Sequence, residues 1–492
     1  MKRNSVIISS ILFVIVLYSC NKFIDLHPSS FNNSSTFYND STGIKEAVFG
    51  AYHYLQPIYG TATWFWAMTE MRSDNTTFEY NNADRGALQG EQIDYFEETP
   101  DNNPILGVWT TIYQAIVQCN MVLDHIDQVK ISDVSKNQAI GEASFLRSLY
   151  YFNLVRLFGS IPLVLHAAQS PDQVYSKKAS VDQVYNQIIS DAKTAASLLP
   201  ASWPASQAGR ATSGSAWTLL GEVYLTLKKY DSAIYAFNQV VNSGKYHLLS
   251  DYNALWNPSN KNNAESVFEV QFTGSVAALS SSYIYSFAPL FSGYATIGSF
   301  SPTSGAGRNI PTRDMINAYE NGDKRKDASI AWFVDPNINP QYYESQHDSM
   351  PYIKKYAYPP SQPNQQNVDF YVYRYAQVLL WLAEAYNENG QTANAIPLIN
   401  QIRERAGLPD ILNSLSQDSV RTIVRHEERV ESAFEDHRWF DLLRYGNAVQ
   451  VMTQNGIEQK SYQLWLDPTA YTDVQNRLLF PIPLNETLLN HF

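Results

Sequence analysis

Paired carboxylates are the first residues in this sequence that could do chemistry, as a general acid and a base. The pairs are Glu97-Glu98 and Glu427-Glu428. Adjacent residues do not face each other across a bond, as the two carboxyl groups of a glycosidase must. The peptide HEERVE begins like a zinc-protease motif at His426 but lacks the second histidine four residues later. The nine histidines are scattered, and the nucleophile-elbow, phosphate-loop and calcium-loop motifs are missing from the sequence. We therefore expect no catalysis, no metal site and no cofactor.

A second charged group lies in EERVESAFEDHRWFDLLRYG (427–446), where acidic and basic residues recur at helical spacing. These residues are Glu428, Arg429, Glu431, Glu435, Arg438 and Asp441. They could serve acid–base chemistry, but ion pairs between helices and interactions at helix ends explain the spacing better. We expect them to be structural.

Aromatic and planar polar side chains gather in TATWFWAMTEMRSDNTTFEYNNADRG (61–86). Rings such as Trp and Tyr can cover the apolar face of a sugar, while amide, carboxylate and guanidinium groups bind its hydroxyls. The candidate ligand-binding residues here are Trp64, Trp66, Arg72, Asp74, Tyr80, Asn81 and Arg85. One of the two tryptophans can equally belong to the core, and Asp74 can equally be structural. Tyr80, Asn81 and Arg85 are the better candidates.

Aromatic residues also fill SSSYIYSFAPLFSGYATIGSFSP (280–302). From this segment we select Tyr283 and Tyr294 as ligand-binding candidates. Because Tyr283, Tyr285 and Phe287 alternate, a strand that places all three on one face is the competing interpretation.

The N-terminus has the layout of a secretion signal. Lys2 and Arg3 precede an uncharged apolar run, residues 6–18, which is too short to span a membrane. The run ends as Leu-Tyr-Ser-Cys, which resembles a bacterial lipobox, with Tyr18 bulkier than usual at its position. We expect residues 1–19 to be a signal peptide and Cys20 to be lipidated, because two or more acyl chains give a stable membrane anchor.

The net charge and the cysteine and tyrosine content indicate which classes of ligand the protein can bind. The sequence has 492 residues and a net charge of −12, which argues against binding nucleic acid. It has two cysteines, so lipidation of Cys20 leaves Cys119 as a buried thiol without a partner. Low charge with many tyrosines is typical of extracellular proteins that bind neutral polar ligands.

Helical periodicity dominates the elements that must position these residues. Apolar spacing predicts helices over residues 43–59, 106–126, 140–158 and 181–199, with one short strand over 266–273. Two further segments share one spacing, SAWTLLGEVYLTLKKYDSAIYAFNQVV (215–241) and LLWLAEAYNENGQTANAIPLINQI (379–402). The spacing matches the tetratricopeptide pattern, in which a small residue, here Gly221 or Ala383, lets the neighbouring helix approach.

The expected fold is mainly α, a tetratricopeptide-like helical solenoid with long, irregular, aromatic-rich ligand-binding loops and little strand. We expect helix pairs over about 140–200, 209–245 and 371–407, and loop regions over 60–104 and 274–370. Residues 20–42 read as a lipidated cysteine with an extended tether, and 43–492 as one domain.

Several blocks resemble the SusD/RagB family in the family's order. EASFLRSLYYFNLVRLFGSIPLV (142–164) is similar to its signature helix, and YRYAQVLLWLAEAYNENG (373–390) resembles a second block, with Gln377 in place of the usual Glu. The peptides IRERAGLP (402–409), EERVESAFEDHRWFDLLRYG (427–446) and NRLLFPIPLNETLLN (476–490) match its later blocks. In this family, ligand contacts come from loops at about the position of residues 61–86.

The resemblance implies an outer-membrane lipoprotein on the cell surface. Such proteins bind oligosaccharides, or in some members peptides, without cleaving them and deliver them to a SusC-like TonB-dependent transporter. A tetratricopeptide-like scaffold that binds other proteins and no nutrient is a further alternative. The aromatic and Asn-rich loops favour neutral glycans, whereas the negative charge would suit cationic peptides.

Overall fold

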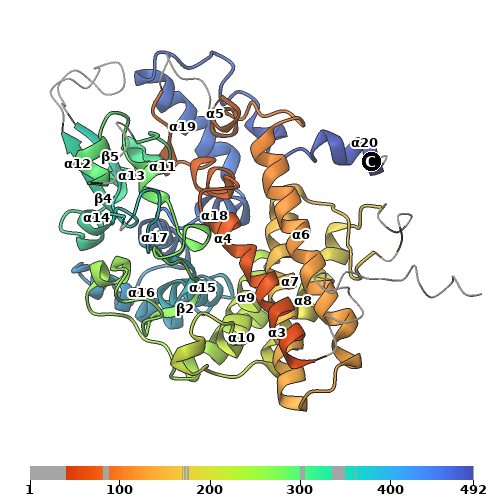
Figure 1. The fold of residues 1–492 in the computed structure, drawn as a ribbon. Helices are drawn as coiled ribbons and strands as arrows, with labels where there is room; N and C mark the ends of the chain where they lie inside the picture. Colours follow the sequence, from red (N-terminus) through yellow and green to blue (C-terminus); the bar gives the residue numbers. More distant parts are fainter. Residues whose placement is uncertain are drawn as a thin grey trace, which may run out of the picture.

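Long helices pack side by side along one flank of the molecule (Figure 1), a computed structural model of the chain. The structure describes residues 40–80, 88–168, 177–299, 305–334, 349–360 and 362–490, together with Ser170, Gln173, Tyr175 and Phe492. The helices of this flank are α3 (Ser41–His53), α4 (Leu55–Tyr59), α6 (Asn103–His125), α7 (Asp133–Phe158) and α8 (Val181–Leu198). α3 and α4 together cover the predicted helix 43–59, which is interrupted at Tyr54, and α6, α7 and α8 cover the other three predicted helices.

The signature segment 142–158 forms the buried half of α7. This helix packs against both α6 and α8, so nearly all of its later side chains are covered whichever way they point. It begins at the Ser132 cap and ends at Gly159, whose positive φ of 72° is favourable for glycine. Among the described residues one stretch, Asn103–Gln128, is long and apolar enough to cross a membrane. That stretch is α6 with the 3₁₀ turn η3 (Ile126–Gln128), and it packs against α3 and α7.

The two predicted repeats are helix hairpins. The first is α9 (Ser213–Thr226) with α10 (Tyr230–Asn242), and the second is α15 (Tyr375–Glu388) with α16 (Thr392–Ala406). At Gly221 an added Cβ would lie 2.4 Å from the Phe237 ring, so glycine allows the two helices to approach closely. Because α8 packs on α9 and α10 packs on α15, the hairpins continue the helical layer, which confirms the tetratricopeptide-like scaffold.

The C-terminal part adds α17 (Gln417–Glu431), α18 (Arg438–Tyr445), α19 (Ala448–Tyr462) and α20 (Leu484–Asn490). The remaining short turns are η2 (Ala67–Met71), η5 (Ala205–Gln207), η6 (Tyr252–Trp256), η7 (Ala277–Leu279) and η8 (Val474–Asn476). α17 packs against α15 and α16, and α18 packs against η2. The end of the chain therefore returns to the first loop region.

Strands are short and occur as antiparallel pairs within the described residues. The pairs are β1 (Thr76–Thr77) with β3 (Ile310–Pro311), β2 (Ser266–Val270) with β6 (Phe370–Arg374), and β4 (Ile330–Val334) with β5 (Ser349–Ile353). β2 confirms the predicted short strand. The pairing of β1 with β3 places the first loop region directly beside the second.

Both predicted loop regions contain short helices that apolar spacing does not reveal. They are α5 (Leu88–Tyr95), α11 (Tyr283–Phe287), α12 (Gly293–Ile297), α13 (Arg313–Ala318) and α14 (Lys324–Ser329). Helices of one or two turns are too short to show a period and are stable only when packed. The alternating tyrosines at 283 and 285 therefore lie in a helix, and the strand alternative is wrong. In Figure 1 the elements α12, α13, α14 and β4 lie on the side opposite α6 and α8.

Candidate binding surface

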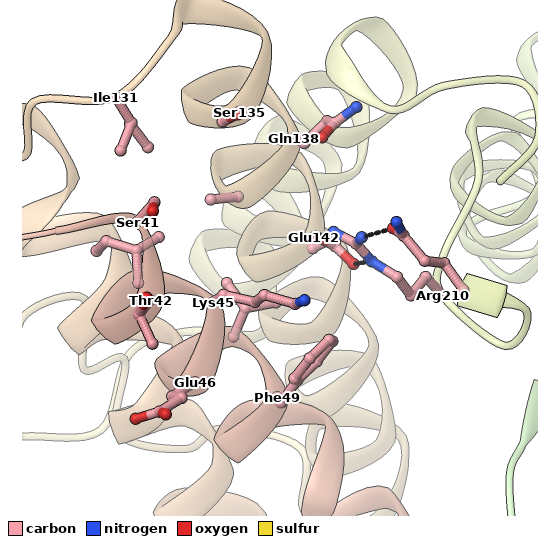
Figure 2. Close-up of a pocket in the computed structure, with 14 residues that line it drawn as sticks. Ser41, Thr42, Lys45, Glu46, Phe49, Ile131, Ser135, Gln138, Glu142 and Arg210 are labelled. Carbon is pink, nitrogen blue, oxygen red and sulfur yellow. Dashed lines mark hydrogen bonds and ion pairs between the residues drawn. The ribbon is translucent and has the colours of Figure 1, made fainter. Parts of the chain in front are cut away.

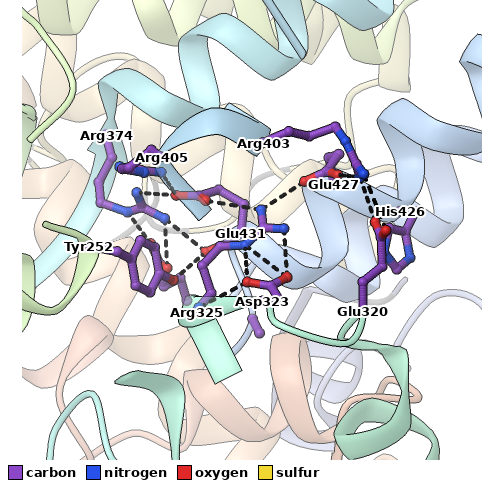
Figure 3. A network of polar contacts seen from close by, with 12 residues as sticks. Tyr252, Glu320, Asp323, Arg325, Arg374, Arg403, Arg405, His426, Glu427 and Glu431 are labelled. Carbon is purple, nitrogen blue, oxygen red and sulfur yellow. Dashed lines mark hydrogen bonds and ion pairs between the residues drawn. The ribbon is translucent and has the colours of Figure 1, made fainter. Parts of the chain in front are cut away.

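The charged groups of the C-terminal blocks form a buried ion network (Figure 3). Arg374 donates hydrogen bonds to Glu265 at 2.8 Å, to Glu431 at 2.9 Å and to Glu435 at 2.7 Å. Arg405 donates to Glu431 at 2.5 Å. The side chains of Arg374 and its three glutamates are fully buried. These contacts confirm the structural interpretation of the charged spacing.

The carboxylate of Glu431, at the centre of this network, is unsuited to acid–base chemistry. Burial alone would raise the pKa of Glu431, but Arg405, Arg374 and Arg325 outweigh that effect and hold the pKa well below its usual range. A carboxylate that stays charged and has no access to solvent cannot exchange protons with a substrate. In the part of the chain that the structure describes, no three His, Cys, Asp or Glu side chains are grouped to hold a metal.

Arg72 and Asp74 lie in the interior, which corrects the expectation that they contact ligand. Arg72 donates to Glu98 at 2.6 and 2.8 Å and is fully buried. Asp74 accepts from Arg438 at 2.7 and 2.9 Å. Burial would raise the pKa of Asp74, but Arg429 and Arg438 keep the pKa well below its usual range. Both residues join the first loop region to other segments and are closed to solvent.

Trp66 and Tyr283 are also buried, with exposed fractions of 3% and 1%. The Trp66 ring packs at 5.2 Å from Phe287, and the Tyr283 hydroxyl donates to the carbonyl of Tyr59 at 2.7 Å. The expectation that they contact ligand is corrected in the same way, since Trp66 packs the first loop region against the second and Tyr283 fixes the second to α4.

Trp64 reaches the surface where the two loop regions meet. It is half-buried, its ring stacks on Trp66 at 5.1 Å, and the guanidinium of Arg308 lies 4.3 Å from its centroid. Gly90 makes room for the ring, because an added Cβ would lie 2.0 Å from it. The φ of Trp64 is +63°, a value that bulky residues seldom adopt and that is concentrated at ligand sites.

Tyr80 follows Glu79, through which the first loop region contacts the second. Its ring stacks on Trp465, from the segment after α19, at 5.1 Å and an angle of 21°. The neighbouring Glu79 holds the second loop region in place. Its backbone N–H donates to Gly307 at 2.7 Å, and its carboxylate accepts from the N–H of Leu290 at 2.7 Å.

Phe291 and Tyr294 follow Leu290, which Glu79 holds in place, and Tyr294 lies in α12; their exposed fractions are 71% and 77%. Phe291 also has a positive φ, +61°. We name the residues Trp64, Tyr80, Phe291, Tyr294 and Trp465 the aromatic loop surface. Exposed rings on a fixed backbone can bind the apolar face of a flat, polar ligand at low entropic cost.

Three predicted residues, Cys20, Asn81 and Arg85, lie outside the described residues. The roles assigned to them stay predictions.

Among the candidates, the sequence interpretation missed Phe291 and Trp465 of this surface, and Arg308, which contacts Trp64. A usable signal exists for Trp465, which lies in the irregular segment QLWLDP (463–468) between two blocks of family resemblance. An aromatic residue outside helical spacing is a better binding candidate than one inside it. The contact between Arg308 and Trp64 depends on the pairing of β1 with β3, so the sequence around either residue does not indicate it.

Comparison with known proteins agrees with this architecture. The model of the SusD family matches residues 264–491, and a second model, described as starch-binding associating with outer membrane, matches residues 22–225. A tetratricopeptide repeat model matches residues 214–243, which are α9 and α10.

Individual relatives match along most of their length. A SusD-like protein of Formosa agariphila is 26% identical over 92% of this chain and 93% of its own. A SusD-like protein of Bacteroides ovatus is 25% identical over 90% of this chain and 83% of its own.

Solved structures share the fold. A laminarin-binding SusD-like protein superimposes with a TM-score of 0.77 at 26% identity, covering 91% of this chain and 97% of its own. The surface glycan-binding protein A of Bacteroides thetaiotaomicron, solved with laminarihexaose, has a TM-score of 0.74 at 20% identity, covering 92% and 98%. With family models that match both parts of the sequence and a shared fold, the chain belongs to the SusD/RagB family.

Proposed function

We propose that this chain is an outer-membrane lipoprotein that binds oligosaccharides at the cell surface and passes them, uncleaved, to a SusC-like TonB-dependent transporter. The observation that carries the proposal is the aromatic loop surface, where Tyr294 and Phe291 expose their rings to solvent. The name of one family model and the laminarin-binding relative support the ligand class and the outer-membrane location. Within the proposal, Asn81 and Arg85 supply polar contacts beside Tyr80.

Calorimetric titration of the soluble form, residues 21–492, tests the ligand class. The probes are laminarihexaose, maltohexaose and a mixture of neutral and cationic peptides. We expect saturable binding of one glycan and none of the peptides. Binding of peptides alone would move the protein to the peptide-binding alternative within the same family.

The variant Tyr294→Ala tests the surface. Removing one stacking ring costs about 1 kcal/mol, so affinity for the bound glycan should fall about five- to tenfold. The melting temperature should not change, because the side chain is exposed. The control is Tyr235→Ala on α10, whose ring is 60% exposed and lies outside the aromatic loop surface. Equal affinity in both variants would contradict the assignment of Tyr294.

The anchor and the partner are tested on the full chain in its membrane. We expect the wild-type protein to copurify with an outer-membrane barrel and Cys20→Ala to leave the membrane fraction. Wild-type protein that copurifies with a barrel but binds no glycan or peptide would favour the scaffold alternative.

A further inference from the structure

Three adjoining cavities surround Arg210 on the face formed by α3, α7 and the segment before α9. Their volumes are about 630, 290 and 350 Å³, and Arg210 lines all three. The first and third share Phe49, and the second and third share Gly209 and Glu269. We name the three cavities together the Arg210 groove. None of its lining residues belongs to the aromatic loop surface.

Arg210 is held rigidly at the centre of the groove. It donates to the two carboxylate oxygens of Glu142 at 2.8 and 2.6 Å, and its guanidinium lies 3.6 Å from the centroid of the Trp203 ring. Trp203 is fixed in turn, because its indole N–H donates to Ala211 at 2.7 Å. The groove therefore has a preformed wall, which lowers the entropic cost of binding a ligand.

The walls combine aromatic surface with neutral polar groups. Phe49 is 41% exposed, and Figure 2 shows it beside Lys45, extending toward Glu142 and Arg210. The first cavity carries two cationic and two anionic side chains, so no net charge selects a charged ligand. Its other polar groups are hydroxyls and amides, among them Ser135 and Gln138.

An amide side chain is fixed in the wall of the third cavity. Gln56 lines this cavity and donates its own N–H to Gln271 at 2.8 Å. Its Oε1 is buried and accepts no hydrogen bond from the residues that the structure describes. The Gln56 amide is therefore a fixed polar part of the wall, and its Oε1, which has no solvent access, is not a ligand contact.

We propose that the Arg210 groove is a second saccharide-binding site, which takes a short uncharged oligosaccharide. Flat rings for the apolar faces, amides and hydroxyls for the hydroxyl groups, and balanced charge all fit that class, and the first cavity alone has the volume of an ordinary ligand site. The groove shares its ligand class with the proposed function but none of its residues, so either assignment can fail without the other.

Fluorine NMR of the soluble chain labelled with 5-fluorotryptophan separates the two sites. Trp203 reports on the groove, while Trp64 and Trp465 report on the aromatic loop surface. Each resonance is assigned by its loss in the corresponding Trp→Phe variant. On titration with laminarihexaose or maltohexaose we expect a saturable shift of the Trp203 resonance.

Variants place the ligand within the groove. Phe49→Ala removes an exposed ring, and Gln138→Phe fills the first cavity from α7. Each variant should raise the dissociation constant measured from the Trp203 resonance about tenfold. The dissociation constants measured from Trp64 and Trp465 should not change. Tyr235→Ala is the control and should change neither.

Two outcomes would overturn the proposal. The first is a Trp203 resonance that neither glycan moves, whatever Trp64 and Trp465 do. The second is a Trp203 shift that remains in full in both groove variants. If Trp64 or Trp465 shifts while Trp203 does not, the groove assignment fails and the proposed function stands.

Discussion

Arg374 is the residue through which three buried glutamates are held together. It contacts Glu265, Glu431 and Glu435, all without solvent access. Charges taken out of water are tolerated only when they are paired and hydrogen-bonded. Glu265 immediately precedes β2, Glu431 ends α17 and Glu435 follows that helix, so one guanidinium joins parts of the chain that are far apart in sequence.

Replacement of this guanidinium should therefore be costly. We expect Arg374→Met to lower the free energy of unfolding by about 3–5 kcal/mol, because the glutamates would remain buried without their partner. Urea unfolding measures the change. The control Lys136→Met breaks an exposed pair with Asp127, 3.0 Å long, and should cost less than about 1 kcal/mol. A loss no larger than that of the control would contradict a structural role for the network.

Among the elements, the loop that carries Phe291 and Tyr294 depends on Glu79. This carboxyl accepts from the N–H of Leu290 and is half-buried, and desolvation by the surrounding protein raises its pKa to about 8. Its ordinary pKa in an unfolded chain is near 4.3. The folded state therefore binds a proton that the unfolded state releases between these two values.

This proton makes the anchoring of the loop sensitive to pH. The stabilisation from Glu79 should be complete below about pH 4 and should decline as the pH rises toward 8, by up to about 1.4 kcal/mol per pH unit. The Glu79→Gln side chain stays neutral, so this variant should lose the part of the fall in the free energy of unfolding between about pH 4 and 8 that comes from Glu79. Urea unfolding at pH 5, 6, 7 and 8 measures it, with exposed Glu404→Gln as the control. Parallel profiles for wild type and Glu79→Gln would contradict the assignment.

The hairpin of α9 and α10 depends on the absence of a side chain at Gly221. A Cβ there would lie 2.4 Å from the buried ring of Phe237. Gly221→Ala should therefore lower the free energy of unfolding by about 1–3 kcal/mol, through overpacking.

Gly50 in α3 is the matched control, because a Cβ there would meet only Gln118, at 3.6 Å. Gly50→Ala should stabilise the protein by about 0.5–1 kcal/mol, since alanine favours the helix more than glycine does. Urea unfolding compares the two variants. Equal effects would show that the hairpin tolerates a larger residue at position 221.

On the scale of the whole molecule, N-terminal and C-terminal segments pack together in the same hydrophobic core. Arg72 donates to the carbonyl of Arg477 at 2.7 Å, and Glu70 accepts from the N–H of Phe434 at 2.8 Å. One hydrophobic core extends from Ala51 to Phe480. The two segments that match separate family models therefore contribute side chains to one hydrophobic core.

Separation of these segments should prevent folding. We expect residues 264–492, expressed alone, to lack near-UV circular dichroism and a cooperative urea transition, because the N-terminal half of the core is removed. Coexpression with residues 21–263 should restore both signals. A cooperative transition of the isolated C-terminal segment would show that it is a domain in its own right.

The amino-acid sequence by itself determined the long helices, both repeats, the short strand β2 and the pairing role of the charged block at 427–446. These features depend on spacing within a few turns of chain, where apolar periodicity and ion-pair spacing act locally. The two predicted loop regions contain short helices besides irregular chain, and Tyr294 in the second region is exposed as expected.

Only the tertiary structure decided which loop residues face solvent. Arg72, Asp74, Trp66 and Tyr283 have the same residue types as a binding site, but distant partners such as Glu98, Arg438 and Tyr59 bury them. Trp465 meets Tyr80 across 385 positions of sequence for the same reason. Burial is a property of the contacts that the folded chain brings together, and spacing along the sequence does not contain it.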